Sequence, residues 1–441
     1  MPPLEALEPF LPRIAGADPE TRQAVTAILE DVVARGDQAV REYTLRFDGV
    51  DLPPEAWELE SATWQSALER ISPILREALA LSVRRVSDYH QRQRETGFHL
   101  AEDDGSVIGM KVAALDRVGL YVPGGKASYP STVIMNAVPA LVAGVQEIIA
   151  VVPPQGITDV VLAACALSGV TRVFRIGGAQ AIGALAYGTK TIPRVDKIVG
   201  PGSRWVAEAK RQVVGRVGID MIAGPTEVLI IADATAWPER VAADMIAQAE
   251  HDEDAIAWCV STDPDLAEAL PSALEEALAR APRGDIARAS LERNGLIVTA
   301  ASMRDAIEVA NRRAPEHLQI VADGAERIAS SVRNAGAIFL GDDTPEPVGD
   351  YIAGPSHVLP TSGTARYASP LGVYDFVKRT SVIRYAAARL LADADAIIAL
   401  AEAEGLYGHA EAVRIRVGGK AGKRGSGEAG KRIVRPVKFR L

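Results

Sequence analysis

The sequence contains little cysteine: Cys165 and Cys259 are the only two in 441 residues, and they stand far apart in apolar segments. A disulfide framework or a cysteine-based zinc site needs several cysteines at short spacings. Free cysteines in apolar surroundings are most often buried and inert. We therefore expect two reduced, buried thiols.

Long hydrophobic runs and an N-terminal targeting pattern are also missing. The most apolar stretch, residues 138–152, is interrupted by Gln146 and Glu147 and is too short to cross a bilayer. The first residues, MPPLEALEPFLPRIAG, lack the basic region and apolar core of a secretory signal. We expect no membrane span and a cytoplasmic location.

The chain has no excess of positive charge. Its 48 Lys and Arg residues against 57 Asp and Glu residues give a net charge of −9, which disfavours a general binder of nucleic acid or anionic membrane and favours small-molecule partners. Residues 420–441 differ, with eight Lys or Arg and one Glu among glycine and serine. This composition is typical of a flexible tail, and nucleic-acid or lipid binding is the alternative.

The sequence does contain the pattern of an α/β protein, in a chain long enough for two or three domains. Asp18 and Pro19 begin a predicted helix that Gly36 ends, and a second helical region covers residues 55–95. From about residue 115, Val- and Ile-rich runs alternate with Ala-rich segments, as in βαβ units. Strands are predicted at 118–122, 147–152, 172–176 and 227–232, and near residues 296, 318 and 337. Because such units occur on both sides of residue 225, we expect two similar halves.

Three glycine-containing loops follow predicted strands. They are YVPGGKASYPST from Tyr121, RIGGAQAIGALAYGT from Arg175, which contains Gly177 and Gly178, and GPGSRW from Gly200. Bare backbone amides in such loops can approach a phosphate, but none of the three has the usual GxGxxG spacing. For each loop, a nucleotide site and a plain tight turn both remain open.

Histidine is scarce, and four of the six histidines lie in segments with other possible metal ligands. The run QAEH ends a predicted helix that begins at Pro238, so Gln248 and His251 are one turn apart on one face. With Asp350 and His409 they offer amide, carboxylate and imidazole ligands, which suit zinc or another borderline divalent ion. The alternative is an ordinary solvated helix end, because four dispersed residues do not make a motif.

Glu316 and His317, in APEHLQI, form a second candidate site. Adjacent side chains diverge on a regular element, but at a loop or helix start both can face one cavity and share acid and base roles. The alternative is a helix N-terminus with Pro315 in its first position and Glu316 favoured by the helix dipole.

Eight segments, in order, together resemble the histidinol dehydrogenase family, from about residue 20 to about residue 417. They are YVPGGKASYPSTVIMNAVPA, GGAQAIGALAYGT, VDKIVGPG, IAGPTEVLIIAD, QAEHDEDA, APEHL, VGDYIAGPSHVLPT and HAEAVRIR. The resemblance implies an oxidoreductase of the last step of histidine biosynthesis, which oxidises L-histidinol to L-histidine through L-histidinaldehyde with two NAD and one Zn²⁺ per subunit. Two alternatives remain: a related zinc- and NAD-dependent dehydrogenase of another amino or hydroxy alcohol, and a non-catalytic metal-binding or regulatory relative.

The same motifs imply a role for each candidate residue. The zinc ligands would be Gln248, His251, Asp350 and His409, and the catalytic pair would be Glu316 and His317. Substrate would contact Thr226, Gln248, His251, His317, Asp350, Glu404 and His409, and NAD would contact Tyr121, Gln180 and Ser203. Zinc would chiefly orient the substrate, His317 would take the alcohol proton, and Glu316 would activate water on the aldehyde.

The resemblance further implies two incomplete Rossmann-like α/β domains with parallel-sheet βαβ units, an N-terminal helical segment and a small C-terminal helical dimerisation domain. The implied parts are an N-terminal helical segment (1–15), a discontinuous α/β domain with the metal and catalytic residues (16–120 and 226–371), an NAD-binding α/β domain (121–225), a C-terminal helical domain reaching the partner subunit (372–418), and a basic flexible tail (419–441). Residues matching Glu404 and His409 come from the partner subunit in that family. A homodimer with shared active sites is therefore implied.

Two positions depart from the family pattern: Ser203 and Ser356 stand where asparagine is common. Serine keeps a hydrogen-bonding group with shorter reach, which puts the NAD contact at Ser203 in doubt. His357 is open to two interpretations: it orients the metal ligands by hydrogen bonding without binding the metal itself, or it has a purely structural role. His90 and His99 are expected at the surface of the N-terminal helical region.

Overall fold

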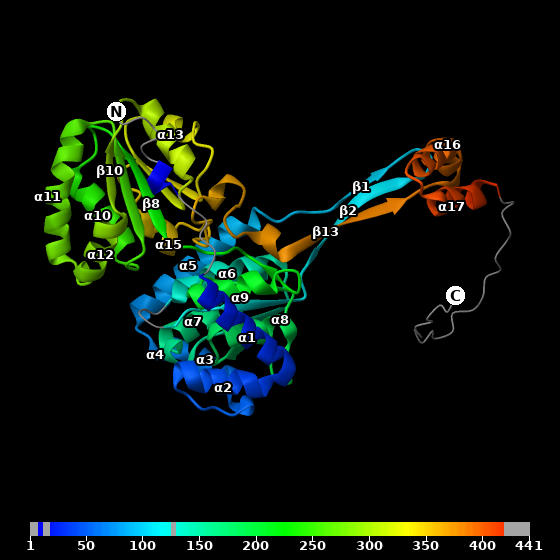
Figure 1. Cartoon of the computed structure of the whole chain (residues 1–441), viewed down its shortest axis with the longest axis horizontal. Coiled ribbons are helices and arrows are strands. Elements are labelled where there is room, and N and C mark those ends of the chain that lie inside the picture. The colour runs from blue at the N-terminus through cyan, green and yellow to red at the C-terminus, as the bar shows by residue number, and fades with distance from the viewer. Residues whose placement is uncertain (1–7, 12–17, 125–128, 419–441) are drawn as a thin grey trace. The chain divides into compact units, whose positions relative to one another are not determined.

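The computed structural model describes residues 8–11, 18–124 and 129–418. The basic tail, Gly125 and most of the predicted N-terminal segment lie outside the described residues. The chain forms two compact units, of which the first comprises Met1–Glu95 and Ala113–Lys378 and the second Thr96–Val112 and Arg379–Leu441. Figure 1 shows the chain and labels many of its helices and strands.

The first half of the larger unit contains a five-stranded parallel sheet with the order β5-β4-β3-β6-β7. Its strands are β3 (Arg117–Tyr121), β4 (Glu147–Val151), β5 (Arg172–Phe174), β6 (Lys197–Val199) and β7 (Gly218–Ile219). The predicted strands near 118, 147 and 172 are thus confirmed. The last of them ends two residues earlier than predicted, where the Arg175 amide donates to the Trp57 carbonyl oxygen instead of continuing the ladder.

Helices surround this sheet. They are α1 (Pro19–Arg35), α2 (Asp37–Asp48), α3 (Ser61–Gln65), α4 (Ala67–Arg70), α5 (Pro73–Gln91), α6 (Pro130–Ala143), α7 (Asp159–Leu167), α8 (Gly178–Tyr187) and α9 (Arg204–Val213), with short 3-10 turns η2 (Pro54–Ala56) and η3 (Pro154–Gly156). The Asp18 carboxylate accepts the Thr21 amide at 2.8 Å and Pro19 opens the helix, as predicted. At the end of α1, the Gly36 amide donates to the Val32 carbonyl oxygen.

Alternating strand side chains build a core on each face of the first sheet. Val118 of β3 shares one buried cluster with Ile134 of α6, and Ile149 of β4 shares the other with Ile182 of α8. Burying each such side chain stabilises the fold by roughly 1.5–3 kcal/mol. The sheet is therefore held between two helical layers, as expected for βαβ units.

The second half repeats this topology. Its parallel strands have the order β10-β9-β8-β11-β12, which matches β5-β4-β3-β6-β7 position by position. The elements are β8 (Glu227–Ala232), α10 (Pro238–Ala249), β9 (Ile256–Ser261), α11 (Pro264–Arg280), α12 (Gly284–Asn294), β10 (Leu296–Thr299), α13 (Met303–Arg313), β11 (His317–Val321), α14 (Ala325–Ala329), β12 (Ala337–Leu340) and α15 (Glu346–Tyr351), followed by η4 (Thr364–Arg366) and η5 (Val373–Phe376). The predicted pair of similar α/β halves is confirmed.

Both cysteines are free and buried, and burial raises the pKa of each thiol to about 12. They are core thiols, as expected. The prediction for His90 was wrong, because its ring is fully buried and its Nδ1 lies 2.7 Å from the Val86 carbonyl oxygen. His99 is exposed, but it lies on a strand rather than in a helical region.

The smaller unit combines three strands and two helices. Its elements are β1 (Phe98–Ala101), β2 (Val107–Ala114), β13 (Val377–Arg384), α16 (Ala387–Ala403) and α17 (Tyr407–Val417), with the strand order β1-β2-β13. The segment predicted as a C-terminal helical domain thus also contributes a strand, and residues 96–112 complete its sheet. In the described part of the chain, no helix is both long and apolar enough to cross a membrane.

Candidate functional site

A cavity of about 230 Å³ in the larger unit contains both members of the predicted catalytic pair. Glu316 directly precedes β11, and His317 is its first residue. Thr226, at the same end of the neighbouring strand β8, also lines the cavity. Pro315 and Glu316 therefore lead into a strand, and the interpretation of Pro315 as the first residue of a helix was wrong.

The Glu316 carboxylate is buried and held by two hydrogen bonds. Its Oε2 accepts the Thr226 hydroxyl at 2.7 Å and the Glu227 amide at 2.9 Å. Burial raises the pKa of Glu316 to about 7, although His317 and the Thr226 hydroxyl act in the opposite direction. A carboxyl group that titrates near neutrality can accept a proton from water and release it again.

The two ring nitrogens of His317 have different surroundings. Nδ1 lies 3.1 Å from the Glu227 carbonyl oxygen, which only accepts, so Nδ1 carries the hydrogen. Nε2 is buried and has no hydrogen-bond partner among the described residues. The backbone thus selects the tautomer in which Nε2 keeps its lone pair, as a general base requires.

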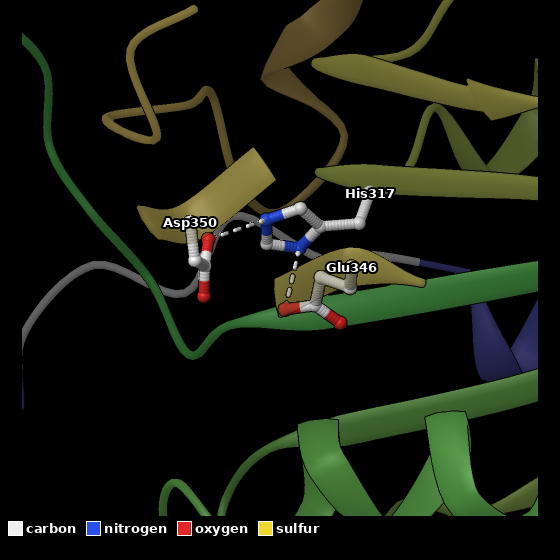
Figure 2. Close-up of side chains that lie close together, drawn as sticks. All are labelled: His317, Glu346 and Asp350. Atoms are coloured by element: carbon white, nitrogen blue, oxygen red, sulfur yellow. Dashed lines mark ion pairs between the residues drawn. The ribbon is translucent and has the colours of Figure 1, made fainter. Parts of the chain in front are cut away.

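His317, Glu346 and Asp350 bring one imidazole and two carboxylates together (Figure 2), with possible ligand atoms within 4.8 Å of one another. Glu346 Oε1 lies 3.6 Å from His317 Nδ1, and Asp350 Oδ1 lies 3.9 Å from Nε2. Burial, with repulsion from Asp350, raises the pKa of Glu346 well above its usual value. A bound cation would relieve this repulsion, and the group could hold a metal ion.

Gln248 and His251 end helix α10 as predicted: Gln248 lies in its last turn and His251 two residues beyond it. Gln248 is fully buried beside Glu346, whereas His251 is an exposed lining residue of the cavity. His251 Nδ1 lies 3.0 Å from the Ala247 carbonyl oxygen and 3.2 Å from that of Gln248. These carbonyls direct the hydrogen to Nδ1 and leave Nε2 as a possible metal ligand.

His357 also lines the cavity, and its Nδ1–H donates to the Asp350 carbonyl oxygen at 3.1 Å. Burial lowers its pKa, which disfavours the protonated ring. This contact supports the backbone of Asp350. Ser356 is buried, where its hydroxyl donates to the Met135 carbonyl oxygen and accepts the Val358 amide, both at 3.2 Å.

The remaining two predicted residues belong to the smaller unit. Glu404 directly follows α16 and His409 lies on α17, and both side chains are exposed. Along the chain, more than fifty residues separate Asp350 from either of them. They are not among the lining residues of the cavity in the larger unit.

A second cavity, of about 790 Å³, contains all three predicted NAD contacts: Tyr121, Gln180 and Ser203. The Gly178 amide donates to the Tyr121 hydroxyl at 3.1 Å, and burial raises the pKa of that phenol to about 12. The Gln180 amide is buried, and neither its oxygen nor its nitrogen has a partner among the described residues. Such an unpaired amide costs free energy unless a ligand satisfies it.

The glycine loop after β6 reaches both cavities, because Pro201 lines the smaller one and Ser203 lines the larger one. The Lys210 ammonium donates to the Gly200 carbonyl oxygen at 2.9 Å, and Asp220 accepts the Gly200 amide at 2.8 Å. Gly200 has a φ of +106°, and a Cβ there would lie 2.2 Å from the Tyr121 carbonyl oxygen. Only glycine fits this approach.

Glu346 was missed by the sequence analysis. It stands four residues before Asp350, so both carboxylates lie on one face of the short helix α15. This spacing is visible in EPVGDY, but acidic pairs at this spacing are common on solvated helices. Only its burial, with 2 % of the residue exposed, distinguishes it.

Comparison with known proteins shows which family this chain resembles. The sequence profile described as histidinol dehydrogenase matches residues 12–417. The chain is 49% identical over 397 residues to the histidinol dehydrogenase of Oceanobacillus iheyensis, covering 89% of this chain and 92% of that protein. It is 52% identical over 410 residues to that of Burkholderia lata, covering 91% and 94%. The crystal structure of histidinol dehydrogenase from Elizabethkingia anophelis matches with a TM-score of 0.89 and 33% identity, over 95% of this chain and 96% of that one.

Proposed function

This chain belongs to the histidinol dehydrogenase family, and we propose that it uses its two cavities to oxidise L-histidinol to L-histidine through L-histidinaldehyde with two NAD. The observation that carries the proposal is the pair at the start of β11. His317 offers an unpaired Nε2 and Glu316 a carboxyl group with a pKa of about 7, both buried in the same cavity.

Gln248, His251 and Asp350 would hold a zinc ion in this cavity. Their amide oxygen, imidazole nitrogen and carboxylate suit this ion, and the concentrated carboxylates favour a cation. The fourth ligand would be His409 of a second subunit. When bound, zinc would supply a template that orients the amino alcohol. This assignment leaves Nε2 of His317 free to act as a base.

In the first oxidation, His317 Nε2 would accept the proton of the substrate hydroxyl as hydride leaves the carbon. The Glu227 carbonyl oxygen holds the ring in the required tautomer through Nδ1. In the second oxidation, Glu316 would accept a proton from the water that adds to the aldehyde. A pKa of about 7 lets a large fraction of Glu316 be ionised at neutral pH.

NAD would occupy the larger cavity, with Tyr121, Gln180 and Ser203 as contacts, and would accept the hydride. The unpaired amide of Gln180 supports this assignment. The loop from Gly200 to Ser203 supports it too, since the same loop borders the catalytic cavity. Ser203 also lines this cavity, and its hydroxyl keeps a hydrogen-bonding group with a shorter reach than asparagine.

We infer that the active enzyme is a homodimer, with Glu404 and His409 completing the partner's site. Both residues are exposed, and so are the neighbouring apolar side chains of Leu400 and Tyr407, each with 68 % of the residue exposed. Exposed apolar groups of this kind favour a protein interface. A cytoplasmic location stays a prediction from the sequence.

NADH formation from L-histidinol tests the proposal directly. Activity should disappear when a chelator removes the metal and return when zinc is added. A zinc-loaded protein that produces no NADH from histidinol, but does so from another amino or hydroxy alcohol, would contradict the substrate assignment. Loss of activity that zinc cannot restore would contradict the metal assignment.

A further inference from the structure

We propose that Glu346 is a positioning residue for Gln248: it holds the side-chain amide so that the oxygen, not the nitrogen, is available to the metal. This inference rests on the proposed function, which makes Gln248 a zinc ligand. It adds a residue that the sequence motifs did not single out. Glu346 acts through Gln248 and is not itself a ligand.

The first support is the geometry of the amide. With the Gln248 nitrogen toward Glu346, this nitrogen lies 3.0 and 3.1 Å from the two carboxylate oxygens, and the amide oxygen lies 3.0 Å from Thr226 Oγ1. The opposite orientation would point the amide oxygen at two acceptors. An NH₂ group can only donate, and an ionised carboxylate, the form that a bound cation favours, can only accept, so Glu346 decides the orientation when a metal is bound.

The second support comes from Thr226, on the other side of the amide. Its hydroxyl has a single hydrogen and donates it to Glu316 at 2.7 Å. The same hydroxyl lies 3.0 Å from the Gln248 oxygen, which can also accept from it. An amide oxygen has two lone pairs, so at least one remains for a cation. Glu346 thus engages the nitrogen of the amide, while the oxygen faces Thr226 and keeps a lone pair for a cation.

The third support is the side of the His317 ring on which Glu346 lies. Figure 2 shows Glu346 beside one ring nitrogen and Asp350 beside the other. Glu346 Oε1 is 3.6 Å from Nδ1, the nitrogen that donates to the backbone, while Asp350 Oδ1 faces the unpaired Nε2 at 3.9 Å. Asp350 thus lies on the side of the ring whose nitrogen has no partner, and Glu346 lies on the side whose nitrogen is bound to the backbone.

Zinc affinity, measured by chelator competition, tests this role without any assay of turnover. The set is the wild type, Gln248→Ala, Glu346→Ala and the double variant. Loss of a group that orients a metal ligand typically costs about 10- to 100-fold in affinity. We expect such a loss for Glu346→Ala, and no further loss when Glu346→Ala is added to Gln248→Ala.

Losses that multiply in the double variant would overturn the proposal, because Glu346 would then bind the metal on its own. Unchanged affinity in Glu346→Ala would overturn it as well. If Gln248→Ala binds zinc as tightly as the wild type, the ligand set of the proposed function fails, and the positioning role fails with it.

Two further variants guard against a fold defect. Glu346→Gln keeps the side-chain volume and one acceptor for the Gln248 amide. The zinc affinity of this variant should therefore lie between those of the wild type and Glu346→Ala. A zinc affinity below that of Glu346→Ala contradicts the proposal. If Glu346→Ala does not fold, Glu346→Gln replaces it in the double variant. Glu208→Gln is the matched control, because this buried carboxylate of α9 accepts from Arg211 at 2.7 Å and should leave zinc affinity unchanged.

Discussion

The Thr226 hydroxyl donates to the Glu316 carboxylate at 2.7 Å across two neighbouring parallel strands. Each residue directly precedes its strand, so the pair lies at the amino ends of β8 and β11. Parallel pairing of these strands brings together residues that are ninety positions apart in the sequence. This contact joins a predicted catalytic carboxylate to a predicted substrate contact.

Replacing His317 with Asn should slow the first oxidation by about 10²- to 10⁴-fold, the usual contribution of a general base. The reason is the loss of the unpaired Nε2 that would accept the alcohol proton. Single-turnover NADH formation from L-histidinol measures this step. Wild-type rates in the variant would exclude His317 as the base.

Replacing Glu316 with Gln should mainly slow the oxidation of L-histidinaldehyde, by a similar factor, because the amide cannot take a proton from water. Supplying the aldehyde directly with NAD isolates this step. The His317→Asn variant is the comparison. If both variants lose both steps equally, the proposed division of labour between the two residues is wrong.

The rate of aldehyde oxidation should rise with pH through a midpoint near 7, since burial raises the pKa of Glu316 and the ionised form is the base. Thr226→Val removes a donor that stabilises the ionised form. A hydrogen bond to a charged group contributes roughly 1.5–3 kcal/mol, so the midpoint should move up by about 1–2 pH units. The pH profile of kcat measures both values, and an unmoved midpoint would show that the contact does not act on Glu316.

Gly200→Ala should weaken NAD binding and destabilise the fold. Its φ of +106° strains any other residue by about 1–3 kcal/mol, and the added Cβ would also lie 2.2 Å from the Tyr121 carbonyl oxygen. Gly215→Ala is the matched control, because Gly215 has a φ of +91° but no atom within 4 Å of the added Cβ. Chemical unfolding and NAD titration compare the two. Equal effects would mean that the close approach to Tyr121 is unimportant.

Mixed dimers test whether sites are shared between subunits. His251→Ala and His409→Ala proteins should each be inactive alone. Random pairing of equal amounts makes half of the dimers hybrids, each with one intact site, so activity should return to roughly a quarter of the wild-type level. No recovery after subunit exchange, verified by differently tagged chains, would place His251 and His409 in the same subunit's site.

Much of the fold could be predicted from local patterns. Asp18, Pro19 and Gly36 delimit the first helix, and the run QAEH does end a helix that begins at Pro238. Apolar periodicity and end signals report on neighbours a few residues away, so they identify elements and a parallel-sheet class. The sheet of β1, β2 and β13 escaped prediction because its strands bury little apolar surface and because β13 joins the local β1–β2 pair from far along the chain.

For the site, the sequence determined which residue types were available: an amide and imidazole one turn apart, an acid beside a histidine, and glycines after strands. Only the tertiary structure decided how they meet. The order of β8 and β11 places Thr226 against Glu316, and the Glu227 carbonyl oxygen selects the tautomer of His317. Burial, not spacing, distinguishes Glu346 from an ordinary surface acid, since burial depends on every element packed around a residue.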